Sequence, residues 1–319
     1  MVYQNIDEVM RDTNELLSLS KKHELSTPIM FEIANPMARF SCIENNRESV
    51  AMSAMESLYL LSGMNGSDFL GEFLNIREPK KNYRYEFSYG PQLRFNGQTS
   101  DVILDYYNSN AFRRSGRGYT DQLAIAIDAF KENKSTQGVI MQFASTVKPL
   151  AVHSVWFYNK NGKLEMLLSA GGTDNYYILP NKILAPFMFI HQLISELVDI
   201  PLGSSRFVIG SLYNSKIQQD QKKHNFPIIN MHNFQYPKGG MTLRDIDTLM
   251  SIMVEFVSRL DENSLGRANP FENDNRVQLW SDYAEVFRAW KAEKLGYKIQ
   301  MEQNFFHPQL RFIFKGEAV

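Results

Sequence analysis

The sequence contains a single cysteine, Cys42, among its 319 residues. One cysteine cannot form an intramolecular disulfide, and it excludes a metal site built from several thiolates. A lone cysteine of this kind is typical of a small buried hydrophobic residue. No apolar run approaches the roughly 20 residues that a transmembrane helix needs, so we expect no segment that crosses a membrane.

Net charge is also nearly absent, at −1, so the molecule as a whole has no attraction to nucleic acid or to an anionic membrane. The N-terminus, MVYQNIDEVMRDTNELLSLSKK, carries acidic residues early and lacks the basic-then-apolar order of a signal peptide, which predicts a cytoplasmic protein. The sequence shows no P-loop, Rossmann glycine fingerprint or Ser-His-Asp signature. The histidines lack metal-ligand spacing, and no metal site is expected.

What the sequence does contain is the composition of a protein with a substantial core, 44% hydrophobic and 22% charged. Apolar residues at helical spacing predict helices over 3–23, 47–64, 120–133, 179–201, 242–262 and 278–295. The helix over 120–133 is expected to begin at an N-cap formed by Thr120 or Asp121.

Strands are predicted over 28–43 (one strand or a hairpin), 138–145, 151–172 (two strands with a turn at 159–162) and 205–214. Residues 75–119, biased toward tyrosine and arginine, are expected to be irregular. Since no repeat or low-complexity linker is visible, we expect one α+β domain over 1–319. It would have an N-terminal helix within 1–24 and a helical addition over 222–300.

Residues 147–182, VKPLAVHSVWFYNKNGKLEMLLSAGGTDNYYILPNK, have the features of the floor of a ligand site. His153 opens an apolar strand, and Asp174 follows in a glycine turn before a helix. Either His153 is catalytic or it is a hydrogen-bonded structural histidine. Either Asp174 binds a ligand or it is the N-cap of the helix. No obvious nucleophile accompanies them.

The order and spacing of several segments resemble thymidylate synthase and the related pyrimidine hydroxymethylases. The resemblance covers most of 25–220 and returns at the C-terminus. It implies a thymidylate synthase-like layered α+β fold with a mixed sheet, C-terminal helical additions and a two-fold homodimer formed through a sheet face. The matching segments are MESLYLLSG (55–63), YGPQLR (89–94), DQL (121–123), GVIMQFA (138–144), GGTDNYYILPNKI (171–183), SLY (211–213) and the terminal HPQLRF…AV.

The chain departs from this family at the nucleophile and at the phosphate contacts. The family's cysteine, which adds to C6 of the pyrimidine, aligns with Val152, and an alkyl side chain cannot form that adduct. Val152 is expected to face a pocket that otherwise persists. Arginines that would clamp phosphate align with Gly171, Gln137 and Gly138. Ordinary binding of dUMP is therefore not expected.

On the substrate side, the family's ribose-contacting histidine aligns with Ser211, whereas Tyr213 is retained. The asparagine that reads the pyrimidine edge aligns with Lys182, which is either a solvated charge or a contact for a substrate carbonyl or carboxylate. A loop offers three cations that form either a relocated anion clamp or an exposed charged loop: Arg113, Arg114 and Arg117.

The residues that do match the family are mainly those that the resemblance places at the folate cofactor. The resemblance assigns Glu56 to proton transfer, Tyr89 to the reacting carbon, Tyr59 and Asp174 to the cofactor, and the terminal Val319 to a closing tail. Glu56 lies on an apolar helix, where an unpaired carboxylate is costly to bury, so it needs a partner or a task. Tyr59 and Tyr89 are alternatively wall or core residues.

Two functions from different classes follow. The first is an enzyme that binds 5,10-methylenetetrahydrofolate and transfers its one-carbon unit, as a methyl or hydroxymethyl group, to a small molecule. That acceptor would be a pyrimidine or nucleotide analogue, or another electron-rich compound that needs no cysteine to activate it. The second is a catalytically inactive homologue that binds a ligand or another protein. The family residues that are missing are mainly those that bind the nucleotide, whereas an inactive site should have lost the folate residues as well. This difference favours the enzyme.

Overall fold

The structure is a computed structural model of the whole chain. It describes residues 1–20, 24–42, 47–63, 89–95, 121–143, 151–175, 178–214, 231, 236, 240–261, 265, 268–272, 274–297 and 305–315.

Within these ranges, seven strands form one mixed, open sheet in the order β1-β3-β7-β6-β5-β4, and β2 also pairs with β7. β6 and β7 are parallel, as are β1 and β3, and the other pairs are antiparallel. The strands are β1 (Val2–Tyr3), β2 (Glu24–Leu25), β3 (Ile29–Ile33), β4 (Val139–Gln142), β5 (Val152–Lys160), β6 (Lys163–Asp174) and β7 (Leu202–Tyr213).

The turn between β5 and β6 confirms the predicted hairpin. Asn161 and Gly162 have φ values of 55° and 78°. Two consecutive residues with positive φ match the twist of the strands that they join, and asparagine followed by glycine adopts them at the lowest cost.

The helices begin and end mostly where the apolar periodicity predicts. Of the two expected N-caps of α6, Asp121 is the one used, and its side chain accepts from the N–H of Ala124. The helices are α1 (Ile6–Leu19), α2 (Arg47–Ser62), α4 (Tyr89–Phe95), α6 (Gln122–Glu132), the π-helix η2 (Leu179–Leu184), α7 (Ala185–Val198), α8 (Leu243–Ser258), the 3₁₀-helix η3 (Asn275–Val277), α9 (Gln278–Lys294) and α10 (Pro308–Lys315).

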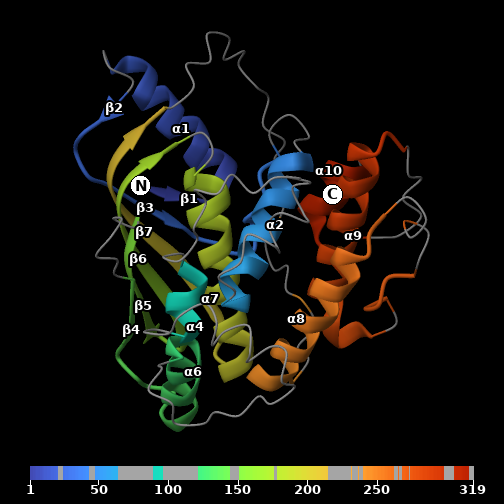
Figure 1. Cartoon of the computed structure of the whole chain (residues 1–319). Coiled ribbons are helices and arrows are strands. Elements are labelled where there is room, and N and C mark those ends of the chain that lie inside the picture. Colours follow the sequence, from blue (N-terminus) through green and yellow to red (C-terminus); the bar gives the residue numbers. More distant parts are fainter. Residues whose placement is uncertain are drawn as a thin grey trace.

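Alternation along the strands gives the sheet an inner, buried face and an outer face. Leu164 and Leu168 of β6 are fully buried on the inner face. On the outer face, Met30, Ile140 and Trp156 are 56%, 57% and 41% exposed although they are apolar. The helices that are described lie on the inner side, with α1 and α7 beside the sheet, α2 in the middle and α8, α9 and α10 on the far side (Figure 1).

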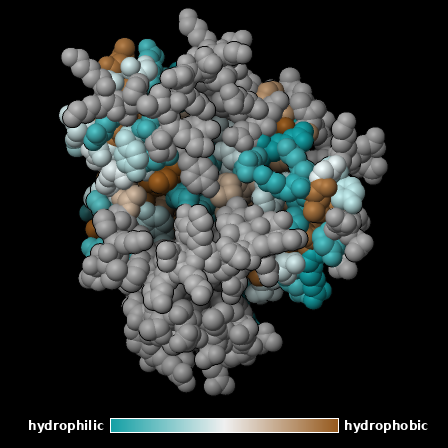
Figure 2. All heavy atoms as spheres, turned by 45° about the horizontal axis from the view of Figure 1, so that its top comes forward, coloured by the Kyte–Doolittle hydropathy of each residue, from teal (hydrophilic) through white to brown (hydrophobic). Residues whose placement is uncertain are grey.

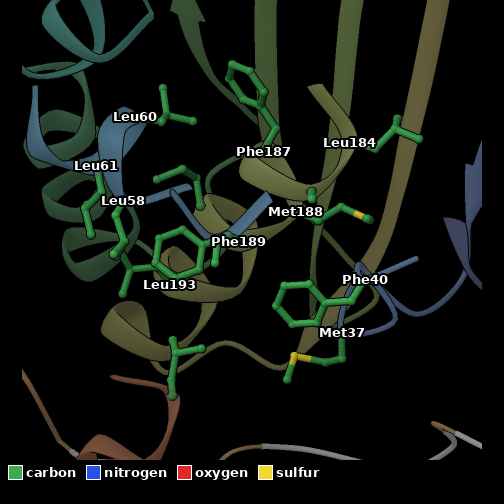
Figure 3. Close-up of a cluster of buried hydrophobic side chains, with 14 of the residues drawn as sticks. Met37, Phe40, Leu58, Leu60, Leu61, Leu184, Phe187, Met188, Phe189 and Leu193 are labelled. Atoms are coloured by element: carbon green, nitrogen blue, oxygen red, sulfur yellow. The ribbon is translucent and has the colours of Figure 1, made fainter. Parts of the chain in front are cut away.

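The core lies between the sheet and these helices. Leu58 and Leu61 of α2 and Phe189 and Leu193 of α7 belong to one cluster of buried side chains that Met37 and its neighbours also join (Figure 3). A buried cluster of this size supplies the main favourable term for folding.

One prediction is wrong, because the segment expected to be irregular contains helix α4. Gly90 and Pro91 disfavour a helix by propensity, but proline is tolerated in a first turn. Gly90 also allows close packing on α2, since a Cβ there would lie 2.7 Å from the carbonyl oxygen of Tyr59. Of the segment 28–43, predicted as one strand or a hairpin, only Ile29–Ile33 forms a strand, β3. The rest of the segment 75–119, apart from α4, lies outside the described residues.

On the face shown in Figure 2, the coloured hydrophilic and hydrophobic residues are interspersed. None of the helices in the described part of the chain combines the length and the apolar composition needed to cross a membrane.

Candidate functional site

The predicted site residues of the strands gather at one end of the sheet. The parallel strands β6 and β7 end at Asp174 and Tyr213, which are paired, and Gly172 is paired with Ser211. β5 runs in the opposite direction and begins at Val152, so its first residues lie at the same end. Ligands of sheets with helical crossovers bind outside the carboxyl ends of parallel strands. This end of the sheet is therefore the candidate site.

A β-bulge divides these residues between the two faces. The pairing shifts between Val152 and Ser154, which places Val152 on the inner face opposite Ala170. His153 is exposed on the outer face, where a Cβ on Gly171 would lie 3.3 Å from its Cε1 and Nε2. The sheet thus stands between His153, predicted as catalytic, and the site residues of the inner face.

Two predicted residues, Glu56 and Lys182, form an ion pair. The Lys182 Nζ lies 3.1 Å from the Glu56 Oε1, and the two side chains are 30% and 12% exposed. Ser49 and Ser53 lie on the same face of α2 as Glu56. Their hydroxyls donate to the Oδ1 of Asn181 at 2.8 and 2.7 Å. These bonds fix η2 against α2, and this contact holds the ion pair.

Tyr89 bonds to the sheet and interacts electrostatically with the ion pair. Its hydroxyl accepts from the backbone N–H of Val152 at 3.0 Å, and its ring packs edge-on against two phenylalanines. Burial raises the pKa of the Tyr89 phenol, backbone hydrogen bonds and the charge of Lys182 lower it, and Glu56 raises it. The phenol is therefore neutral at physiological pH and within electrostatic reach of both charged groups.

Arg94 anchors the helix that carries Tyr89. It is buried, and it donates from Nε to Asp121 Oδ2 at 3.1 Å, from Nη1 to the Leu61 carbonyl at 2.9 Å and from Nη2 to Asp247 Oδ1 at 2.9 Å. These bonds join α2, α4, α6 and α8. The segment YGPQLR contains this arginine, but spacing alone does not distinguish a structural arginine from one that binds a ligand.

The expectation that Val152 faces a pocket is wrong. Its side chain is fully buried in the hydrophobic core, because the bulge turns it to the inner face. Only its backbone N–H takes part in the site, through Tyr89. Cys42 is buried as predicted, and burial raises the pKa of its thiol. A thiol that stays protonated is a poor nucleophile.

Asp174 does not cap the helix that follows it, so that alternative is wrong. The π-helix η2 begins at Leu179, its N-cap is Ile178, and no side chain caps it. Asp174 instead ends β6 with a buried side chain. Tyr59 is buried within α2 and belongs to the core, which was its alternative role.

At the end of β7, Ser211 is half-buried beside Gly172, where a Cβ would lie 2.7 Å from the serine Oγ. Tyr213, two pairs further on, is exposed. The remaining predicted residues lie outside the described part of the chain: Arg113, Arg114, Arg117 and Val319.

No family model and no curated protein matches this chain. The site is therefore characterised by its geometry. Among the residues that the structure describes, no three His, Cys, Asp or Glu side chains are grouped so that they could hold a metal ion. The inner face offers a carboxylate, an ammonium group and a neutral phenol close together. Such a set can bind a polar ligand edge and move a proton.

Proposed function

We propose that this chain is a thymidylate synthase-like, folate-dependent one-carbon transferase that works without a cysteine nucleophile. The acceptor is pyrimidine-like or another electron-rich compound, and the transferred group is methyl or hydroxymethyl. The observation that carries the proposal is the Glu56–Lys182 ion pair beside the Tyr89 phenol at the end of the parallel strands. The mixed sheet with helices on one side is compatible with the layered fold that the resemblance implies.

The two charged residues of the inner face each have a task in this proposal. Bound 5,10-methylenetetrahydrofolate would supply the one-carbon unit as an electrophile, with its own nitrogen as the leaving group. For a methyl product it would also supply the hydride and become dihydrofolate, whereas a hydroxymethyl product would take its oxygen from water. An acceptor carbon that is already electron-rich needs no thiolate to activate it, and Glu56 accepts the proton that this carbon loses. Lys182 donates to a carbonyl or carboxylate oxygen of the acceptor, and Ser211 and Tyr213 at the end of β7 are its further contacts. Orienting both reactants supplies much of the acceleration.

The residues assigned to the cofactor fit it in part. The Asp174 side chain is buried, at the end of β6, so a pterin has to reach it from the end of the strand and compete with the contacts that it already has. Charge-assisted hydrogen bonds from the N–H groups of a pterin to a carboxylate are strong. Tyr59 is almost completely buried. It therefore supports the wall of the site and offers no open ring on which a pterin could stack.

Binding of methylenetetrahydrofolate, measured by equilibrium titration, tests the proposal. The Asp174→Asn variant is expected to bind roughly 10- to 100-fold more weakly, because a hydrogen bond to a charged group contributes about 1.5–3 kcal/mol. Asp12→Asn, at a half-buried position of α1 next to Arg11, is the matched control and should bind like the wild type.

Two results would contradict the proposal. One is the absence of measurable folate binding with and without candidate pyrimidines. The other is rapid turnover of dUMP by the Val152→Cys variant. A cysteine there would replace a fully buried side chain, so we expect no thymidylate synthesis from this single change.

A second candidate is a catalytically inactive homologue that acts as a ligand-binding or protein-interaction module. The burial of Val152 favours it, since no side chain at that position can reach a substrate. Consumption of bound methylenetetrahydrofolate distinguishes the two functions. A transferase uses up the one-carbon unit once an acceptor is added, whereas a binding module leaves it unchanged.

The proposal includes a homodimer formed through the outer face of the sheet. Met30, Ile140 and Trp156 expose apolar surface there, and a second copy would bury it. We expect Trp156→Glu to shift the protein toward monomer in sedimentation equilibrium, because a carboxylate is costly to bury at an interface. Tyr297→Glu, at an exposed position just after α9, should not. A wild type that is monomeric at all concentrations would exclude this interface.

A further inference from the structure

Arg39 carries a positive charge into the interior, and the part of the chain that the structure describes supplies no ion-pair partner to it. The side chain is fully buried. Its Nη1 donates to the Oε1 of Gln192 at 2.5 Å, and the Nε2 of Gln192 donates in turn to Glu196 at 2.6 Å, which fixes the orientation of the amide. None of the described carboxylates forms an ion pair with Arg39. An unpaired buried charge is strongly unfavourable.

Three aromatic rings surround this guanidinium. Its Cζ lies 5.4 Å from the ring centroid of Phe40, 5.5 Å from that of Phe189 and 6.0 Å from that of Tyr283. Phe40 and Phe189 lie inside the buried cluster (Figure 3). Aromatic rings stabilise a desolvated cation through their faces, but they accept none of the hydrogen bonds that its N–H groups make in the plane.

The hydrogen bonds that Arg39 does not make define one edge of the guanidinium. Its Nε and Nη2 have no hydrogen-bond partner within the described ranges, and neither has the hydroxyl of Tyr283. Nε–H and Nη2–H point in the same direction and match the two oxygens of a carboxylate. Unpartnered donors around a permanent positive charge suit an anion better than a neutral water molecule.

The ionisable neighbours do not neutralise Arg39. Asp282 already accepts from the Tyr236 hydroxyl at 2.7 Å and from the backbone N–H groups of Phe306 and His307 at 2.8 Å each. His307 is neutral, because burial, and then the charge of Arg39, lower its pKa well below the ordinary value. Among the described groups, none therefore compensates the charge of Arg39 at its Nε–Nη2 edge.

We propose that Arg39 and Tyr283 bind a small planar oxyanion of the carboxylate type, represented by formate, between α7 and α9. The anion accepts from Nε and Nη2 of Arg39 and from the Tyr283 hydroxyl, and its charge compensates the guanidinium. This site uses none of the residues of the proposed one-carbon transfer and is independent of that proposal. Since the anion binds the folded state only, it stabilises the fold.

Thermal unfolding in sodium formate, compared with sodium gluconate at equal ionic strength, tests this inference. We expect formate to raise the Tm by about 3 °C and the increase to saturate, as binding to a single site requires. Arg39→Met keeps much of the volume and should lose the increase. Arg206→Met should keep it, because Arg206 is paired with Glu32 on the sheet.

Equal formate effects in the wild type and in Arg39→Met would overturn the inference, as would an increase that never saturates. If Arg39→Met does not fold, a crystal structure of the wild-type protein grown in formate decides. Planar density across Nε and Nη2 of Arg39 supports the site, and a lone water molecule or no density there overturns it.

Discussion

Replacing Arg94 with methionine is expected to lower the free energy of unfolding by about 3–5 kcal/mol, the usual cost of removing one partner from a buried ionic cluster. Methionine keeps part of the volume but donates no hydrogen bond. Asp121 and Asp247, with side chains 21% and 10% exposed, would remain charged without this partner. The carbonyl of Leu61 would lose the N–H that it accepts from Arg94. Urea unfolding followed by circular dichroism measures the change.

The matched control is Arg259→Met. Arg259 pairs with Glu255 one turn away on α8, but both side chains are more than half exposed. An exposed pair at this spacing contributes about 0.3–0.5 kcal/mol, so the control should change stability by no more than that. If both variants lose the same stability, Arg94 is not the anchor of α4.

The Asp282→Asn variant is expected to remove a pH dependence of stability. Burial raises the pKa of Asp282 to about 7, although hydrogen bonds from Tyr236, Phe306 and His307 lower it. The carboxyl therefore keeps its proton in the folded state at pH values where the unfolded chain has lost it. Its contribution is complete below the unfolded pKa of 3.8 and is lost as the pH rises through about 7. Asparagine resembles the protonated acid and has no such dependence.

Urea unfolding of both proteins between pH 4 and pH 8 measures this effect. His191 acts in the opposite direction, because burial lowers its pKa to about 4, so its contribution is lost as the pH falls. Both proteins contain His191, so its contribution cancels when the free energy of unfolding of the variant is subtracted from that of the wild type. We expect Asp282→Asn to gain stability relative to the wild type as the pH rises through 7. A difference that does not vary with pH would show that Asp282 stays ionised in the folded state.

Much of the fold could be predicted because long apolar periodicities are local. The helices α1, α2 and α9 and the hairpin of β5 and β6 follow the spacing of their own residues. Helix α4 could not be predicted in this way. Gly90 is unfavourable in an isolated helix, and it is used here because α4 approaches the backbone of α2 too closely for a side chain.

The sequence singled out Glu56, Lys182 and Tyr89 one by one but did not predict how they are arranged. Glu56 and Lys182 each carried a separate role, and only the contact between α2 and η2 makes them an ion pair. Strict alternation would place His153 on the same face as Val155 and Phe157, which are buried. The bulge reverses this. A bulge depends on how two strands pair, and the sequence of one strand does not encode it.

The π-helix η2 has a consequence for how this site can change. A π-turn accommodates one residue more than an α-turn, and each residue of an α-helix turns the chain by about 100°. A shortening of η2 by one position would therefore swing Lys182 away from Glu56 and bring a neighbouring side chain to the carboxylate. The side chain that faces Glu56 can thus be exchanged by a single insertion or deletion, with every surrounding residue type left as it is.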